Sequence, residues 1–242
     1  MVTASLPPPL IALLGGSFNP PHAGHFRIAI EVEEALSPAE TLFIPCASPP
    51  HKTADNLLPF AFRAALLRAA LTEAGMDKSF AVCEVENERS GPSYTVDTLA
   101  LLTTRYPDKR LAFILGGEDY AQLPTWRRWR ELPTLADLVV LPRGKKGEKS
   151  FCDTTRALWP EAREIVNPFS SAGKAFVLPD NGRLLFLPQP LLAISSSLVR
   201  ERWLHGRRLD FLMPRAVQDL LRERESTVRM LWNAASRANA SS

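Results

Sequence analysis

Two histidines, His22 and His25, stand one helical turn apart in the segment GGSFNPPHAGH. At this spacing both imidazoles can reach the same anion. Gly15 and Gly16 precede them and permit a tight turn in which the backbone comes close to a ligand. A helix that begins near Gly24 would add free N–H groups and the positive end of its dipole. The segment therefore predicts a phosphate site.

A second cationic segment, SPPHK, follows the apolar stretch 41–45. It contains His51 and Lys52, and the lysine supplies a fixed positive charge that suits a triphosphate. A single histidine more often has a structural role, but three of the four histidines in the chain fall in these two segments. This concentration favours a functional role.

The segment ISSSLVR, residues 194–200, has two interpretations. Ser195, Ser196 and Ser197 are of a type that commonly caps a helix N-terminus, so the segment can be an ordinary capped helix. Alternatively, its hydroxyls and free N–H groups, with Arg200 about one turn further on, form a second phosphate clamp. The presence of the histidine segment favours the clamp.

These segments need a scaffold that brings them together. Short apolar runs alternate along the chain with helical patterns, which predicts an α/β protein with a doubly wound parallel sheet and ligands at the carboxyl ends of its strands. The predicted strands cover residues 10–14, 41–45, 80–85, 111–115, 137–141 and 183–188. Helical patterns cover residues 25–36, 59–75 and 94–106.

We expect a single domain over residues 10–223, whose C-terminal part from about residue 195 is helical. Residues 1–9 are expected to form a flexible extension. The segment 224–242 is expected to be a tail, disordered from residue 233 because its side chains are small and polar. The basic segment 142–150 is expected to be an exposed loop.

Composition limits the partners of the chain. Its 242 residues carry a net charge of only +3, which is too even for a nucleic-acid-binding surface. No segment has the length or the basic flank of a membrane span or a signal peptide. Three cysteines without metal-ligand spacing predict reduced thiols, no metal held by protein ligands and a cytoplasmic location. We expect neither nucleic acid nor membrane partners; the oligomeric state stays open.

The chain resembles the HxGH nucleotidylyltransferase superfamily, whose members have a Rossmann-like fold. GGSFNPPHAGH resembles the first motif of that superfamily and ISSSLVR the second. The similarity runs from about residue 10 to residue 223 and is greatest to the bacterial nicotinate-nucleotide adenylyltransferases, through ERSGPSYTVDTL, FILGGEDYAQLPTWRRWREL and LMPRAVQDLL. Asn19 stands where that family often has aspartate, and Ser197 where threonine is common.

The resemblance implies an adenylyltransferase of NAD biosynthesis. It would transfer AMP from ATP to nicotinate mononucleotide, giving nicotinate adenine dinucleotide (deamido-NAD) and pyrophosphate. The phosphate of the mononucleotide would attack the α-phosphorus in line, without a covalent enzyme intermediate. Mg²⁺ would arrive with ATP, coordinated by phosphate oxygens and water.

The resemblance also implies a set of site residues. The catalytic pair is His22 and His25. ATP would be bound by Gly15, Gly16, Ser17, Phe18, Lys52, Gly116, Asp119, Ile194, Ser195, Ser196, Ser197 and Arg200. Nicotinate mononucleotide would be bound by Tyr94, Thr95, Trp126, Arg127 and Arg143.

Several of these residues keep a second interpretation. Asp119 is either a ligand contact or a helix N-cap, and Arg143 reaches a substrate phosphate or is an ordinary surface arginine. Trp126 and Trp129 are three positions apart and would share a helical face, so both can be core residues. The resemblance implies that the first tryptophan stacks on the pyridine ring, and we assign Trp129 to the core.

The start of the helix near Tyr94 and Thr95 offers N–H groups without intrahelical acceptors, and these can bind a carboxylate. The resemblance places a second donor at the backbone N–H of Arg127.

Two alternatives to this function remain. One is another transferase of the superfamily, such as a pantetheine-phosphate adenylyltransferase. The other is a non-catalytic nucleotide-binding module or an RNA-binding module, although the tryptophans lie among apolar and turn residues and not along a basic stripe.

Overall fold

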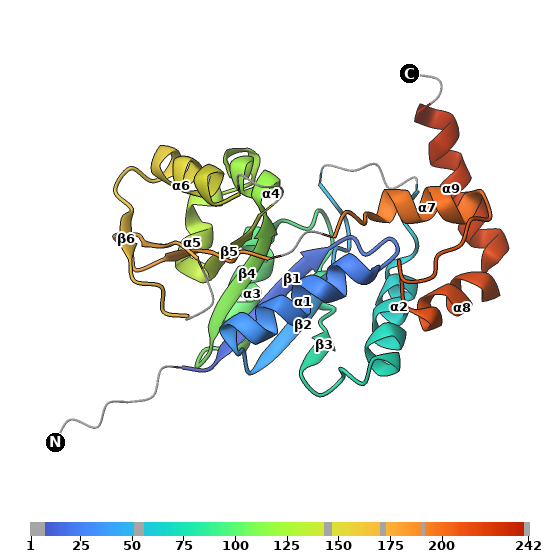
Figure 1. Ribbon diagram of the computed structural model, residues 1–242, viewed down its shortest axis with the longest axis horizontal. Helices are drawn as coiled ribbons and strands as arrows, with labels where there is room; N and C mark the ends of the chain where they lie inside the picture. The colour runs from blue at the N-terminus through green and yellow to red at the C-terminus, as the bar shows by residue number, and fades with distance from the viewer. Residues whose placement is uncertain (1–7, 51–55, 143–146, 170–172, 190–191, 240–242) are drawn as a thin grey trace. The chain divides into compact units, whose positions relative to one another are not determined.

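The computed structural model describes residues 8–50, 56–142, 147–169, 173–189 and 192–239, with side chains up to residue 233. The strands of these residues form one sheet in the order β3-β2-β1-β4-β5-β8-β7-β6 (Figure 1). Their bounds are β1 (Leu10–Gly16), β2 (Glu40–Pro45), β3 (Phe80–Val82), β4 (Arg110–Gly116), β5 (Asp137–Leu141), β6 (Arg163–Ile165), β7 (Ala175–Val177) and β8 (Arg183–Phe186). The order changes direction between β1 and β4, as in a doubly wound sheet.

The pairing confirms the predicted parallel sheet. β1 pairs with β4, β4 with β5 and β5 with β8, all in parallel, with Leu14 opposite Ile114 in the first pair. These strands are almost continuously buried, which explains their unbroken apolar sequences. Two further strands, β7 and β6, were not predicted; β7 pairs antiparallel with β8, and β6 pairs antiparallel with β7. Each has only three residues, too few to show a sequence period.

The three predicted helical segments are all helices, and each end lies within two residues of its predicted position. Their bounds are α1 (Ala23–Leu36), α2 (Phe60–Glu73), α3 (Thr95–Arg105), α4 (Gly117–Ala121), α5 (Leu132–Leu135), α6 (Gly147–Leu158), α7 (Ser196–Leu204), α8 (Arg215–Glu223) and α9 (Glu225–Asn239). Short 3₁₀ turns are η2 (Val85–Glu88), η3 (Leu123–Thr125) and η4 (Trp129–Glu131). The predicted strand 80–85 ends at Val82, and α6 begins inside the predicted loop 142–150.

The described residues group into two compact units, and the single domain over residues 10–223 stays a prediction. The first comprises the described residues of Met1–Leu14, Val32–Thr41 and Thr95–Leu191. The second comprises those of Gly15–Glu31, Leu42–Tyr94 and Leu192–Ser242. Both motifs of the predicted phosphate site belong to the second unit.

In the first unit, an aromatic cluster fills the space between α4, α6 and the sheet. Phe151 lies 5.4 Å from Tyr120 and 5.5 Å from Phe186, between ring centroids. The buried Tyr120 hydroxyl is 2.7 Å from the Thr155 hydroxyl, so its polar end has a partner.

The amino ends of three strands in this unit share a buried carboxylate. Asp137, at the start of β5, accepts hydrogen bonds from Arg110 and from Arg183, whose Nη2 is 2.7 Å away. Burial raises the pKa of Asp137 to about 6, although Arg110 acts in the opposite direction. The carbonyl of Pro9 accepts from the Arg110 N–H at 2.9 Å. The structure describes only residues 8 and 9 of the predicted flexible extension 1–9. Of these two, Pro9 is held by this hydrogen bond from Arg110.

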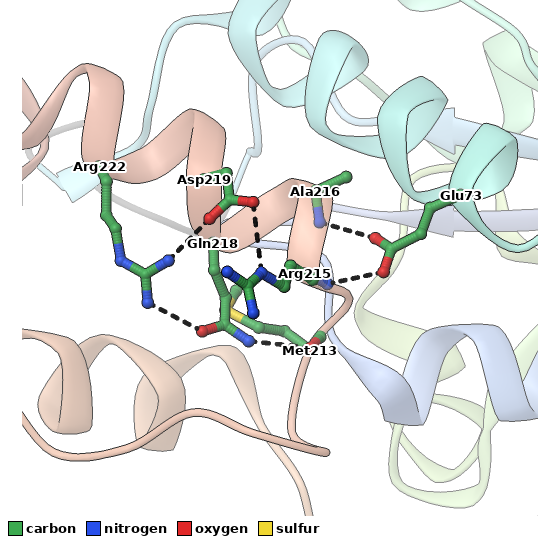
Figure 2. A network of polar contacts seen from close by, with 7 residues as sticks. All are labelled: Glu73, Met213, Arg215, Ala216, Gln218, Asp219 and Arg222. Atoms are coloured by element: carbon green, nitrogen blue, oxygen red, sulfur yellow. Dashed lines mark hydrogen bonds and ion pairs between the residues drawn. The ribbon is translucent and has the colours of Figure 1, made fainter.

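In the second unit, α2 and α8 pack side by side (Figure 1). Pro214, the N-cap of α8, offers no side-chain cap. The Glu73 carboxylate at the end of α2 instead accepts the N–H groups of Arg215 at 3.2 Å and Ala216 at 2.6 Å (Figure 2). A carboxylate at a helix N-terminus also favours the helix dipole, so this contact fastens α8 to α2.

The predicted disordered tail is wrong for the described residues, because α9 extends from Glu225 to Asn239. Val228 and Trp232 of α9 are buried, and the Trp232 ring meets that of Trp203 on α7 edge-on at 6.3 Å. The few large side chains in this segment therefore suffice to dock the helix. Within the described residues, no helix has both the length and the apolar character that a membrane span requires.

Candidate active site

The loop after β1 is shaped by Gly16 and Phe18. Phe18 adopts a left-handed backbone with φ of 45°, and its ring is fully buried, 4.9 Å from the His25 ring and 5.8 Å from that of Phe43. A Cβ at Gly16 would lie 3.1 Å from this ring, so glycine is the residue that fits. The predicted tight turn is present, and a buried aromatic anchor holds it.

His22 and His25 form a stacked pair at the start of α1. Their ring centroids are 3.7 Å apart, and the backbone N–H of His22 donates to Nδ1 of His25 at 3.1 Å. Because Nδ1 of His25 accepts this bond, the neutral ring carries its hydrogen on Nε2. A Cβ at Gly24 would lie 3.1 Å from Cε1 and Nδ1 of His22. Gly24 therefore lets the His22 ring lie against the helix.

Burial favours the neutral form of both imidazoles. Burial lowers the pKa of His22 to about 4. Burial and the neighbouring His22 lower the pKa of His25 well below its ordinary value of 6.5. Nδ1 of His22 is buried without a hydrogen-bond partner among the described residues. A bound anion would offset the cost of charging these rings.

The second motif meets the first in the same unit. Ser195 is the N-cap of α7 and accepts from the Leu198 N–H at 3.2 Å. The Ser196 hydroxyl donates to the carbonyl of Pro20 at 3.0 Å, across 176 sequence positions. The predicted cap is therefore confirmed, and the same segment is fastened to the histidine loop.

Arg200 strengthens this junction. Its guanidinium donates to the Asn19 carbonyl at 2.9 Å and to the Ser197 hydroxyl at 3.0 Å. Burial lowers the pKa of this guanidinium. The carbonyl of Ile194 lies 3.6 Å from the position of a Cβ on Gly24, so the two motifs are in close contact.

Asn19 stands where aspartate is common in the family that the sequence resembles. Its side-chain amide acts both as a hydrogen-bond donor and as an acceptor. Nδ2 donates to the Asn56 carbonyl at 2.7 Å, and Oδ1 accepts from the Leu58 N–H at 3.0 Å. The sequence alone does not indicate this role of Asn19. A short polar side chain after two glycines gives no sign of a partner 37 positions away.

Replacing Asn19 with aspartate is expected to destabilise the protein by about 2 kcal/mol. The side chain is 2% exposed, and a carboxylate there cannot donate to Asn56 and would face its carbonyl oxygen. Chemical denaturation of the Asn19→Asp and wild-type proteins at pH 7 measures the difference. Equal midpoints would show that the Nδ2 contact contributes nothing.

The first unit holds Gly116 and Asp119. Gly116 ends β4 and is the N-cap of α4, so the alternative of Asp119 as an N-cap is wrong. The Asp119 side chain is exposed in the first turn of that helix. Its interpretation as a ligand contact stays a prediction.

The two tryptophans do not share a helical face as predicted. Arg128 has a left-handed backbone with φ of 50° between them, and the segment consists of two 3₁₀ turns. Trp129 is buried 5.3 Å from the Trp159 ring, which confirms its assignment to the core. Trp126 is half-buried, and the Phe113 ring meets it edge-on at 6.4 Å. Trp126 is therefore the tryptophan with accessible ring surface.

The predicted carboxylate donors lie at the start of α3. The helix begins at Thr95, whose N–H has no acceptor within the helix. The Tyr94 N–H, by contrast, donates to the Pro92 carbonyl at 3.1 Å and is already used. Arg127 is exposed, with its guanidinium 3.8 Å from the Asp97 carboxylate. His51, Lys52 and Arg143 lie outside the described residues.

No group of three or more His, Cys, Asp or Glu residues in the described part of the chain is placed to hold a metal ion. Among the described residues, Cys46, Cys83 and Cys152 form no disulfide, and burial raises the pKa of Cys46 to about 11. The thiol of Cys46 is therefore not a nucleophile at neutral pH.

The sheet and the two joined motifs define a nucleotidyltransferase of the cytidylyltransferase-like family, whose sequence model matches residues 13–202. A relative from Methylococcus capsulatus, named "Probable nicotinate-nucleotide adenylyltransferase", is 38% identical over 90% of this chain and 98% of its own. A relative of the same name from Syntrophotalea carbinolica is also 38% identical, over 86% of this chain and 92% of its own. Within the cytidylyltransferase-like family, the chain belongs to the nicotinate-nucleotide adenylyltransferases.

Solved structures agree at the level of the fold. The nicotinic acid mononucleotide adenylyltransferase of Plasmodium falciparum, solved with NaAD, aligns with a TM-score of 0.67. The alignment covers 89% of this chain and 95% of that one at 17% sequence identity.

Proposed function

We propose that this chain transfers AMP from ATP to nicotinate mononucleotide, giving nicotinate adenine dinucleotide and pyrophosphate. The observation that carries this proposal is the junction of the two motifs: the stacked His22 and His25 lie in a loop fastened to α7 by Ser196 and Arg200. Both segments supply donors that suit phosphate oxygens. Family membership supplies the identity of the two substrates.

The chemistry requires positioning and charge stabilisation. The phosphate of the mononucleotide is itself the nucleophile, so no side chain needs to form a covalent intermediate. His22 and His25 would stabilise charge at the α-phosphorus, with Nε2–H of His25 as a donor whose tautomer is already fixed. The backbone of Gly15, Gly16, Ser17 and Phe18 would bind the nucleotide phosphates.

Mg²⁺ would bind at this site through the phosphates of ATP and not through side chains of the two motifs. The segments GGSFNPPHAGH and ISSSLVR contain no carboxylate, and imidazole, hydroxyl and guanidinium groups are not a magnesium cage. Phosphate oxygens and water would therefore hold the ion, which would neutralise triphosphate charge.

The remaining residues receive roles within the same proposal. Lys52 and Arg200 would neutralise phosphate charge, while the Ser195, Ser196 and Ser197 segment binds phosphate oxygens and Ile194 lies near adenine. Gly116 and Asp119 would complete the ATP site. Nicotinate mononucleotide would contact Tyr94, Thr95, Trp126, Arg127 and Arg143.

The test is product identification. The protein is incubated with ATP and Mg²⁺ and, separately, with nicotinate mononucleotide, nicotinamide mononucleotide or 4′-phosphopantetheine, and products are identified by mass. Nicotinate adenine dinucleotide is the expected main product. Product formed only with phosphopantetheine would support the alternative transferase, and absence of any product a non-catalytic module.

Replacing Trp126 with alanine is expected to weaken nicotinate mononucleotide binding by about 1–3 kcal/mol and ATP binding much less, because its ring would stack on the pyridine. Trp129→Ala is the matched control: it should lower the melting midpoint, since that ring is 9% exposed and packs on Trp159. Substrate saturation and thermal midpoints are measured for both variants. A reversed pattern would mean that Trp129 is the platform.

A further inference from the structure

Arg63 is fully buried in the first turn of α2, at 0% exposure. Its guanidinium lies 5.5 Å from the ring of Phe60. Arginine is rarely buried to this extent unless its guanidinium is paired with hydrogen-bond acceptors. The partners of Arg63 therefore show why the sequence places a cation in the apolar stretch FAFRAALL.

The guanidinium donates to three backbone carbonyls from three separate segments. Nε bonds Leu58 at 2.8 Å, Nη1 bonds Ser17 at 2.7 Å and Nη2 bonds Cys46 at 2.7 Å. These segments are the loop after β1, the loop after β2 and the approach to α2. All three carbonyls lie outside helices and strands, where a buried C=O needs another donor.

Because the peptide group is planar, the hydrogen bond from Arg63 to Ser17 also sets the orientation of the next N–H group in the loop after β1, which is the predicted phosphate-binding loop. In a trans peptide, the C=O of one residue and the N–H of the next point in opposite directions. The Ser17 C=O points at Arg63, so the N–H of Phe18 points away from it. The Gly16 C=O similarly accepts from the Cys46 N–H at 2.8 Å, which turns the Ser17 N–H away from Cys46.

We propose that Arg63 is a positioning residue of the phosphate-binding loop, which fixes the Ser17 carbonyl so that the Phe18 N–H faces the polyphosphate of the bound nucleotide. This inference rests on the proposed function. The three hydrogen bonds of Arg63 described above all go to backbone carbonyls. Lysine would keep the charge but could not donate in a planar fork to three carbonyls.

The experiment compares Arg63→Lys and Arg63→Met with Arg68→Lys and Arg68→Met. Arg68 lies on the same helix but is exposed and ion-paired with Glu84, so its variants should keep kcat and KM within about twofold. Both Arg63 variants should lose about a hundredfold in kcat, because a misplaced loop disturbs the transition state. KM should rise for ATP and stay constant for nicotinate mononucleotide. Rates are taken below each melting midpoint and divided by the folded fraction.

A purely structural role would lower the melting midpoint of the Arg63 variants but leave kcat and the KM for ATP at wild-type values once normalised. That result would overturn the proposal. Wild-type enzyme and His22→Ala are assayed in parallel. If wild type forms no dinucleotide, the proposed function fails. A different outcome rejects only the role of Arg63: the wild-type protein forms the dinucleotide, His22→Ala has reduced activity, and the Arg63 variants keep the wild-type kcat and KM for ATP.

A second measurement does not depend on the folding of any variant. In the wild-type protein labelled with ¹⁵N, a non-hydrolysable ATP analogue with Mg²⁺ should shift the Phe18 amide proton downfield, as a new charge-assisted hydrogen bond does. The amide of Ala74, at the end of α2, serves as a reference that should not move. An unmoved Phe18 resonance at saturation would overturn the proposed orientation.

Discussion

Replacing His22 with alanine is expected to lower turnover by about two orders of magnitude or more. The imidazole would act at the α-phosphorus, where negative charge accumulates in the transition state and little of it is present in bound ATP. The loss should therefore fall on kcat more than on KM. The kcat of purified wild-type and variant proteins is measured with both substrates saturating.

The fold should survive this substitution. The backbone N–H and C=O of His22 both form hydrogen bonds with His25, and alanine keeps these groups. Nδ1 of the His22 ring has no hydrogen-bond partner among the described residues, so its removal breaks no such bond. His205→Ala is the matched control, because His205 is an exposed histidine at the end of α7 and should leave turnover unchanged. A His22→Ala protein with near-normal turnover would contradict the role of this ring.

The second large effect is a preference for the acid over the amide form of the pyridine substrate, which we expect to reach about 10⁴-fold in kcat/KM. Thr95 is the first residue of α3, so the positive end of that helix is available to a carboxylate. The carboxamide of nicotinamide mononucleotide would bring an NH₂ donor against N–H donors and leave them unpaired.

Two substitutions at Thr95 separate backbone from side chain. Proline suits the first position of a helix but lacks the N–H, so Thr95→Pro should keep α3 and reduce the preference. Thr95→Ser keeps the N–H and should change the preference little. The measurement is kcat/KM for both mononucleotides under identical ATP and Mg²⁺. Equal values in the wild-type protein would refute the carboxylate pocket.

Much of this architecture could be predicted because its determinants are local. The buried strands of the parallel sheet are continuous apolar runs, and DLVVL was placed at its observed bounds 137–141. His22 and His25 could be paired because a helical turn fixes their spacing. Ser195 could be named as a cap because the Oγ acceptor of a cap lies three residues from its donor.

The remainder depends on contacts that sequence spacing does not show. Arg63 reaches Ser17 across 46 positions, and only its charge within an apolar stretch marks it as unusual. The helical face assumed for Trp126 and Trp129 failed because Arg128 adopts a left-handed backbone, which a non-glycine residue seldom does. The helix α9 was missed because the small and polar side chains from residue 233 onward resemble those of a disordered segment, whereas Val228 and Trp232 before them are buried and dock the helix.

The helix α7 contacts both the histidine loop and the helix α9. Its first turn carries Ser196, Ser197 and Arg200 against the histidine loop, and further along, Trp203 packs on Trp232 of α9. A substitution that weakens the packing of Trp203 on Trp232 would shift α7 as a whole, because a helix of only nine residues moves as a rigid unit. The packing of Trp232 therefore contributes to the placement of Ser196 and Arg200 at the histidine loop, far along the sequence from α9.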